Sequence, residues 1–164
     1  MFRMNDYIMY GLTGVCKVIG IEEEKFLDYP QQSFYVLEPV FSPQMTIKIP
    51  VLNTIKNIRP IHSTDEVKEL IQKIPDLELL WIFDERERNN LFRQMLRNAN
   101  CDEWIIVIKT IYSYKYLDNY KGKRLNKNDD EIFKIAEKLL NEEFGFVLNI
   151  NPDDVPTYIG ECII

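Results

Sequence analysis

Short runs of β-branched and aromatic residues, separated by turn residues, make up the first sixty positions of the chain. The runs cover residues 7–10, 15–21, 33–37 and 45–51. Between the first two runs, Gly11 and Gly14 have a spacing that suits a tight turn with positive φ. Helix-length periodicity does not interrupt these runs, so the pattern predicts four or five short strands that form a small antiparallel barrel.

After Ile61 the spacing of the apolar residues becomes that of helices. Ser63 and Glu66 have the spacing of a capping box, which predicts a short helix that ends near Pro75. Asp84 and Glu87 have the same spacing and predict the start of a second helix, which ends around residues 98–100.

Two further helices are predicted in the last third of the chain. The first begins at Asn100 or Asp102 and carries an apolar stripe of Trp104, Ile105, Val107, Ile108, Ile111 and Tyr112. The second begins near Asn128 or Asp129, and Gly145 is expected to weaken or end it. Strands followed by helices predict an α+β fold with two domains, residues 1–61 and residues 62–164.

Composition places the chain among ordinary globular proteins. It has 164 residues, of which 46% are hydrophobic and 28% charged. The longest apolar run, residues 104–108, is far shorter than the ~20 residues needed to cross a bilayer, and residues 1–11 lack a secretory pattern. We therefore expect a cytoplasmic protein without a membrane partner.

Charge is distributed unevenly along the chain. The net charge is -6, but residues 86–127 contain ten basic and four acidic side chains, between two acidic flanks. A basic segment of this kind is typical of a phosphate-binding surface, and it is equally typical of a solvated helical face. The charge pattern alone leaves both interpretations open.

The residues that would carry catalysis are sparse. The three cysteines, Cys16, Cys101 and Cys162, are odd in number and form no Cys-x-x-Cys motif, which argues against a disulfide scaffold or a zinc ribbon. His62 is the single histidine and lies far along the chain from Cys16 and Cys101. Cys16 and Cys101 are therefore expected to be buried thiols that have no general base beside them.

Neighbouring carboxylates do not provide evidence for a metal site or for catalysis. The pairs Asp129 with Asp130 and Asp153 with Asp154 are explained by helix capping and the helix dipole, without a bound metal. Gly11 and Gly14 lead from one strand into another and not into a helix, so they do not form a phosphate-binding loop. The sequence thus predicts no enzyme, no metal, no cofactor and no small-molecule substrate.

Five short blocks in the amino-terminal part carry a family resemblance. They cover residues 5–10, 11–15, 34–37, 46–51 and 58–61. In the same order they resemble blocks of the CarD-type bacterial transcription factors, whose amino-terminal module is shared with the RNA polymerase-interacting domain of the transcription-repair coupling factor. Leu12 and Thr13 replace a histidine-containing turn of that family. The carboxy-terminal part resembles the family more loosely.

The resemblance implies a Tudor-like or SH3-like barrel, residues 1–61, followed by a helical DNA-binding domain, residues 62–164. It implies that the barrel binds the RNA polymerase β subunit through an edge strand, with Thr46, Lys48 and Pro50 as contacts.

The helical domain would bind promoter DNA weakly, mainly through the backbone, and change the stability of the open complex. The DNA contacts implied are Trp81, Arg86, Arg88, Arg93, Arg97, Lys109, Lys115, Lys123 and Arg124. Trp81 lies about one helical turn before the position near Glu85 where some members carry a wedge tryptophan, so a wedge role and a core role both stay open.

Two other functions compete with this prediction. In the first, the chain is a protein-only module, with a barrel that binds a partner and helices that form a dimer interface. In the second, it is a small hydrolase or redox enzyme that uses Cys101 or an acidic pair.

Overall fold

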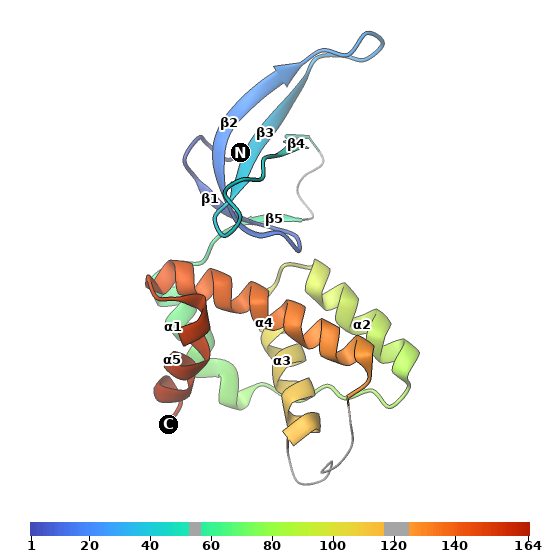
Figure 1. Cartoon of the computed structure of the whole chain (residues 1–164), viewed down its shortest axis with the longest axis vertical. Helices are drawn as coiled ribbons and strands as arrows, with labels where there is room; N and C mark the ends of the chain where they lie inside the picture. Colours follow the sequence, from blue (N-terminus) through green and yellow to red (C-terminus); the bar gives the residue numbers. More distant parts are fainter. Residues whose placement is uncertain (53–56, 117–124) are drawn as a thin grey trace. The chain divides into compact units, whose positions relative to one another are not determined.

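A computed structural model of the chain describes residues 1–52, 57–116 and 125–164. Strands come first and helices follow, which confirms the α+β prediction (Figure 1). The chain divides into two compact units, Met1–Ile61 and His62–Ile164. Within the described ranges, no helix has the length and apolar character that a membrane span requires.

The first unit is a five-stranded antiparallel sheet. The strands are β1 (Tyr7–Tyr10), β2 (Gly14–Glu24), β3 (Gln32–Pro39), β4 (Ile47–Pro50) and β5 (Ile58–Pro60). Their order in the sheet is β4-β3-β2-β1-β5. The predicted strand positions are therefore confirmed, with β2 and β3 longer than expected. Closure of the sheet into a barrel stays a prediction.

Alternation along the strands builds the core of this unit. The buried cluster consists of Ile8, Cys16, Val18, Tyr35, Leu37 and Ile49. The turn between β1 and β2 has positive φ at Gly11 (44°) and Gly14 (95°), as the glycine spacing predicts. Cys16 is buried, in agreement with its expected role as a small apolar residue.

The second unit consists of helices. They are α1 (Thr64–Lys73), η1 (Ile74–Asp76), α2 (Glu85–Arg97), α3 (Cys101–Tyr116), α4 (Lys127–Leu148), η3 (Pro152–Asp154) and α5 (Val155–Cys162). α4 packs against each of α1, α2, α3 and α5, so it is the central helix of the unit (Figure 1). Its buried residues include Ile132, Ala136, Leu139, Leu140 and Phe144.

Side-chain caps start the helices where the sequence predicts. Ser63 and Glu66 form both hydrogen bonds of a capping box at α1. Asp84 accepts from the Glu87 backbone N–H at α2. Asn100, one of the two predicted caps of α3, accepts from the backbone N–H groups of the first turn.

Two predictions about α4 and α3 need correction. α4 begins at Lys127, capped by Asn126, slightly before the predicted start, and it continues through Gly145 to Leu148. A Cβ on Gly145 would lie 3.0 Å from the backbone O of Ile150 and the N of Pro152, so this glycine permits close approach of the next segment. In α3, Tyr112 is 52% exposed and does not belong to the core.

Candidate functional site

β4 is an edge strand whose only partner among the described residues is β3. The Val51 backbone N–H donates to the Ser33 carbonyl, 2.8 Å away, so Val51 occupies a position hydrogen-bonded to β3. Because these positions alternate along an antiparallel pair, Ile49 also faces β3, while the N–H and C=O of Lys48 face the open edge. β4 therefore presents backbone groups suited to pairing with another strand.

The side chains of β4 separate into two faces. Ile49 is buried, whereas Thr46, Lys48 and Pro50 are exposed. The Lys48 Nζ lies 2.5 Å from a Glu22 carboxylate oxygen and 2.7 Å from one of Glu24. Hydrogen bonds to Glu22 and Glu24 raise the pKa of the Lys48 ammonium above its ordinary value. The exposed face of β4 is thus available to a partner, but the charge of Lys48 is shared with the two glutamates.

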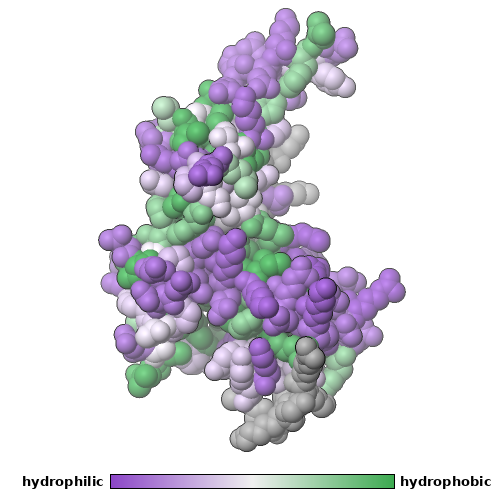
Figure 2. Space-filling model, in the orientation of Figure 1, coloured by the Kyte–Doolittle hydropathy of each residue, from purple (hydrophilic) through white to green (hydrophobic). Residues whose placement is uncertain are grey.

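α2 carries four polar residues along one stripe. Arg86, Asn90, Arg93 and Arg97 follow one another at spacings of four, three and four residues, which places them on one side of the helix. The buried residues Phe92, Met95 and Leu96 lie on the opposite side. We call these four residues the α2 stripe. Figure 2 shows predominantly hydrophilic side chains over the region of the helical unit where α2 lies.

The α2 stripe is mostly open to solvent. Arg86 and Arg97 are exposed, and Arg93 is half-buried, with its Nη2 3.3 Å from an oxygen of Glu131 on α4. The acidic residues of α2, Glu85 and Glu87, do not lie on the stripe, because their spacing from Arg86 turns them to other sides of the helix. The stripe therefore gathers three guanidinium groups on one surface, of which that of Arg93 is paired with Glu131.

Arg88, in contrast, is a core residue, with only 4% of its surface exposed. Its Nε and Nη2 donate to the two carboxylate oxygens of Asp129, at 3.1 and 2.6 Å, and its Nη1 donates to the Ile82 carbonyl at 2.7 Å. Asp129 is also buried. The assignment of Arg88 as a phosphate contact stays a prediction, and such a contact would require the pair with Asp129 to open.

Trp81 is held between two side chains. Its ring stacks on Tyr114 with 3.6 Å between ring centroids and 7° between planes. The Arg88 guanidinium lies over the Trp81 ring, 4.2 Å from its centroid. Of the two roles that the sequence leaves open, this packing favours the core role, since a base could stack on the indole only after one neighbour moved.

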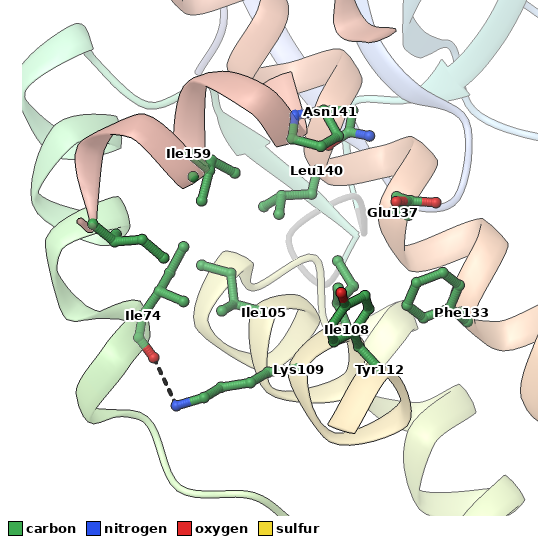
Figure 3. Close-up of a pocket in the computed structure, with 13 residues that line it drawn as sticks. Ile74, Ile105, Ile108, Lys109, Tyr112, Phe133, Glu137, Leu140, Asn141 and Ile159 are labelled. Atoms are coloured by element: carbon green, nitrogen blue, oxygen red, sulfur yellow. Dashed lines mark hydrogen bonds between the residues drawn. The ribbon is translucent and has the colours of Figure 1, made fainter. Parts of the chain in front are cut away.

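Lys109 also acts inside the helical unit. Its Nζ donates to the carbonyls of Ile74, Pro75 and Leu77 at 2.9, 2.9 and 2.6 Å, which uses all three of its N–H donors. Figure 3 shows the bond to Ile74 beside an apolar pocket of about 410 Å³. The assignment of Lys109 as a DNA contact stays a prediction, and such a contact would require the ammonium to leave carbonyls that follow α1.

Three further basic residues, Lys115, Lys123 and Arg124, are predicted DNA contacts. Lys115 is half-buried, and its Nζ lies 5.1 Å from the centroid of the Tyr116 ring. Lys123 and Arg124 lie outside the described residues. Arg86, Arg93 and Arg97 of the α2 stripe are therefore the predicted DNA contacts that one described helix presents on a single side.

The structure also brings together three residues that sequence reasoning did not connect. His62 precedes the cap of α1, Cys101 is the first residue of α3, and Glu143 lies on α4. Their nitrogen, sulfur and carboxylate ligand atoms all lie within 4.8 Å of one another. The separations along the chain, 39 and 42 residues from Cys101, gave no local motif that would have revealed this cluster.

Comparison with known proteins identifies the first unit. Residues 2–62 match the family model of the CarD-like/TRCF RID domain. The first unit is a CarD-like domain. The match covers all five strands, so the open edge of β4 belongs to the CarD-like unit.

A second similarity extends beyond the CarD-like unit into the helices. The chain is 24% identical, over 159 residues, to a Bacillus subtilis (strain 168) protein named "Putative transcription factor YdeB". The aligned region covers 96% of this chain and 99% of the relative. This similarity therefore extends over both units of the chain.

Proposed function

We propose that this chain is a transcription regulator that binds the RNA polymerase β subunit through the CarD-like unit and promoter DNA through the helical unit. It acts by binding, without catalysis, and changes the stability of the open complex. The observation that carries the proposal is the match of residues 2–62 to the CarD-like/TRCF RID domain. The full-length similarity to a relative named as a transcription factor supports the same class of function.

The polymerase contact is placed at the open edge of β4. A partner strand would pair with the outward N–H and C=O of Lys48, and backbone hydrogen bonds of this kind give affinity while exposed side chains select the partner. Thr46, Lys48 and Pro50 are the exposed side chains at this edge. Because Lys48 already pairs with Glu22 and Glu24, the backbone edge is expected to contribute more than the lysine charge.

Two substitutions at one position separate these contributions. Lys48→Pro removes an N–H that faces away from β3, which an edge strand tolerates. Lys48→Met removes the charge and keeps the N–H. In a pull-down of core polymerase with the full chain, we expect Lys48→Pro to weaken binding by about tenfold, the equivalent of one backbone hydrogen bond. Lys48→Met should weaken it less.

The DNA contact is placed on the α2 stripe. Phosphate contacts depend on charge and not on sequence, and Arg86, Arg93 and Arg97 present three guanidinium groups on one side of a helix. If all three engage phosphates, log affinity falls with log salt concentration with a slope of roughly -3. Binding by the free chain is expected to be weak because the net charge is -6.

A salt titration tests this contact on forked promoter DNA in the presence of polymerase. The double variant Arg86→Glu with Arg97→Glu should make the slope shallower by about two and leave polymerase binding intact. Lys68→Glu, at an exposed position on α1, is a control for a single charge reversal outside the stripe and should behave like the parent. If the double variant keeps polymerase binding and its salt dependence of DNA binding equals that of the parent, the result favours the protein-only module instead.

A further inference from the structure

We propose that His62, Cys101 and Glu143 form a zinc-binding site in the helical unit. The three ligand atoms converge on one point from three elements: the start of α1, the start of α3 and the carboxyl half of α4. This proposal is independent of the polymerase and DNA contacts.

The distances suit a tetrahedral ion. The Nδ1 of His62 lies 2.9 Å from Oε1 of Glu143 and 3.8 Å from the Sγ of Cys101, and this Sγ lies 3.1 Å from Oε2. Zinc bonds of about 2.0–2.3 Å to nitrogen, oxygen and sulfur place neighbouring ligand atoms roughly 3.3–3.7 Å apart. The nitrogen–sulfur separation is already close to this range. Oε1 lies nearest Nδ1 and Oε2 lies nearest Sγ, and with one oxygen taken from Glu143 the three ligand atoms lie within 4.8 Å of one another. A rotation of the Glu143 carboxylate is therefore needed to bring one oxygen to bonding distance together with Nδ1 and Sγ.

Charge favours a divalent ion at this place. Glu143 is fully buried, and it accepts hydrogen bonds from the His62 backbone N–H and the Cys101 thiol, which offset part of the cost of removing a carboxylate from water. A bound cation would offset more of that cost. Cys101 is buried as well, with 2% of its surface exposed. One thiolate and one carboxylate balance the two positive charges of the ion, and neutral imidazole adds none. The donor set of nitrogen, sulfur and oxygen is one that zinc accepts, whereas calcium and magnesium prefer oxygen alone.

The surroundings hold the ligands in place. The His62 backbone N–H donates to Oε1 of Glu143 at 3.1 Å, which fixes the carboxylate independently of the imidazole. The His62 side chain is 25% exposed, so the cluster is reached from solvent on that side. Three protein ligands leave a fourth position for water.

Binding exchanges a proton for the ion. Zn²⁺ displaces the Cys101 thiol proton to solvent and forms a bond to the thiolate sulfur. A neutral His62 ring binds through Nδ1 with its single proton on Nε2, and a protonated ring first releases its Nδ1 proton to solvent, so the ligand is neutral imidazole in both cases. The oxidation state of the sulfur does not change. The ion would then link α1, α3 and α4, so zinc is expected to stabilise the helical unit.

The test uses the full chain, stripped of metal by a chelator under reducing conditions and titrated with Co²⁺ as a spectroscopic substitute for zinc. We expect saturation at one equivalent, with the visible bands of a tetrahedral site and a thiolate-to-cobalt charge-transfer band, all removed by added Zn²⁺. Zinc should also raise the thermal unfolding midpoint with increasing concentration.

Variants assign the ligands. Cys101→Ser should abolish the charge-transfer band, and His62→Ala should weaken zinc binding at least tenfold. Cys162→Ser is the matched control and should bind like the parent, because Cys162 lies outside the cluster. Glu143 is left intact, since it accepts hydrogen bonds from both of the other members.

Three results would overturn the proposal. The first is a parent chain that binds no Co²⁺ at stoichiometric concentration, which would leave the cluster as a hydrogen-bonded part of the core. The second is a charge-transfer band that persists in Cys101→Ser. The third is a band that disappears in Cys162→Ser, which would place the thiolate elsewhere.

Discussion

Arg88 and Asp129 illustrate how a charged side chain is used inside the helical unit. Two hydrogen bonds join them, the Ile82 carbonyl accepts a third, and Trp81 covers the guanidinium. A buried pair of this kind gains little over an apolar replacement, but removal of one partner leaves a charge without compensation. The pair is therefore expected to be structural, and its loss is expected to act on stability before function.

Substitution of Arg88 by Met should lower the free energy of unfolding by about 3–5 kcal/mol, because Asp129 is then buried and unpaired. The double variant Arg88→Met with Asp129→Leu should recover most of that loss, since neither charge remains. Urea denaturation of the two variants and the parent measures both effects. A single variant as stable as the parent would show that the pair is not buried as described.

Glu142 gives a pH dependence whose sign follows from its burial. Burial raises the pKa of the Glu142 carboxyl, and Lys138, 3.9 Å away, opposes the shift only in part. The folded state then holds the proton more tightly than the unfolded state, so ionisation destabilises the fold above the folded pKa. Below the ordinary pKa of a glutamate both states are protonated, and this destabilisation disappears.

Glu142→Gln should therefore raise the free energy of unfolding at about pH 7, and the difference from the parent should vanish at about pH 4. Urea denaturation at the two pH values is the measurement. A variant that is less stable than the parent at neutral pH would contradict the sign of this linkage.

The helices show that local sequence patterns predict where a helix begins better than where it ends. The start of α1 is predicted correctly because the capping box uses Ser63 and Glu66, three positions apart, so all its information is local. Gly145 was expected to weaken or end α4, but the helix passes through it. Helix propensity could not reveal that residues 150–152 return to lie against this glycine.

Two glycine substitutions test that explanation at the level of the helix. Gly145→Ala should destabilise the helical unit by about 1–3 kcal/mol, because the new Cβ meets backbone atoms that cannot move independently. Gly160→Ala in α5 is the matched control, since nothing lies within 4 Å of its Cβ. It should be neutral or stabilise by up to ~1 kcal/mol. Chemical denaturation compares the two, and equal effects would refute the close-approach explanation.

The sequence predicts the exposed residues of β4 but not which basic residues of α2 are exposed, because the second depends on a distant partner. The exposed positions Thr46, Lys48 and Pro50 follow from alternation along one strand, which the sequence shows directly. The sorting of the basic residues into exposed Arg86 and buried Arg88 depends on Asp129, 41 positions away. Long-range partners of this kind decide which charges remain available, and no local pattern contains them.

In the whole molecule, the proposed DNA contact depends on the proposed polymerase contact. A chain with net charge -6 is expected to bind DNA weakly by itself, so polymerase binding through the CarD-like unit would supply a high local concentration of the α2 stripe near the promoter. An effect on the open complex further requires that the chain contact open and closed complexes differently, because equal binding shifts no equilibrium.

The lifetime of the open promoter complex shows whether the chain acts on polymerase and promoter together. Polymerase and promoter are mixed with the parent chain, with Lys48→Pro, with Arg86→Glu plus Arg97→Glu, or with the Lys68→Glu control, and dissociation is followed after addition of competitor DNA. We predict that the parent and the Lys68→Glu control change the lifetime, and that both site variants lose this effect. Only Lys48→Pro should weaken polymerase binding as well. A lifetime that the parent does not change, or that both site variants change as the parent does, would contradict the account.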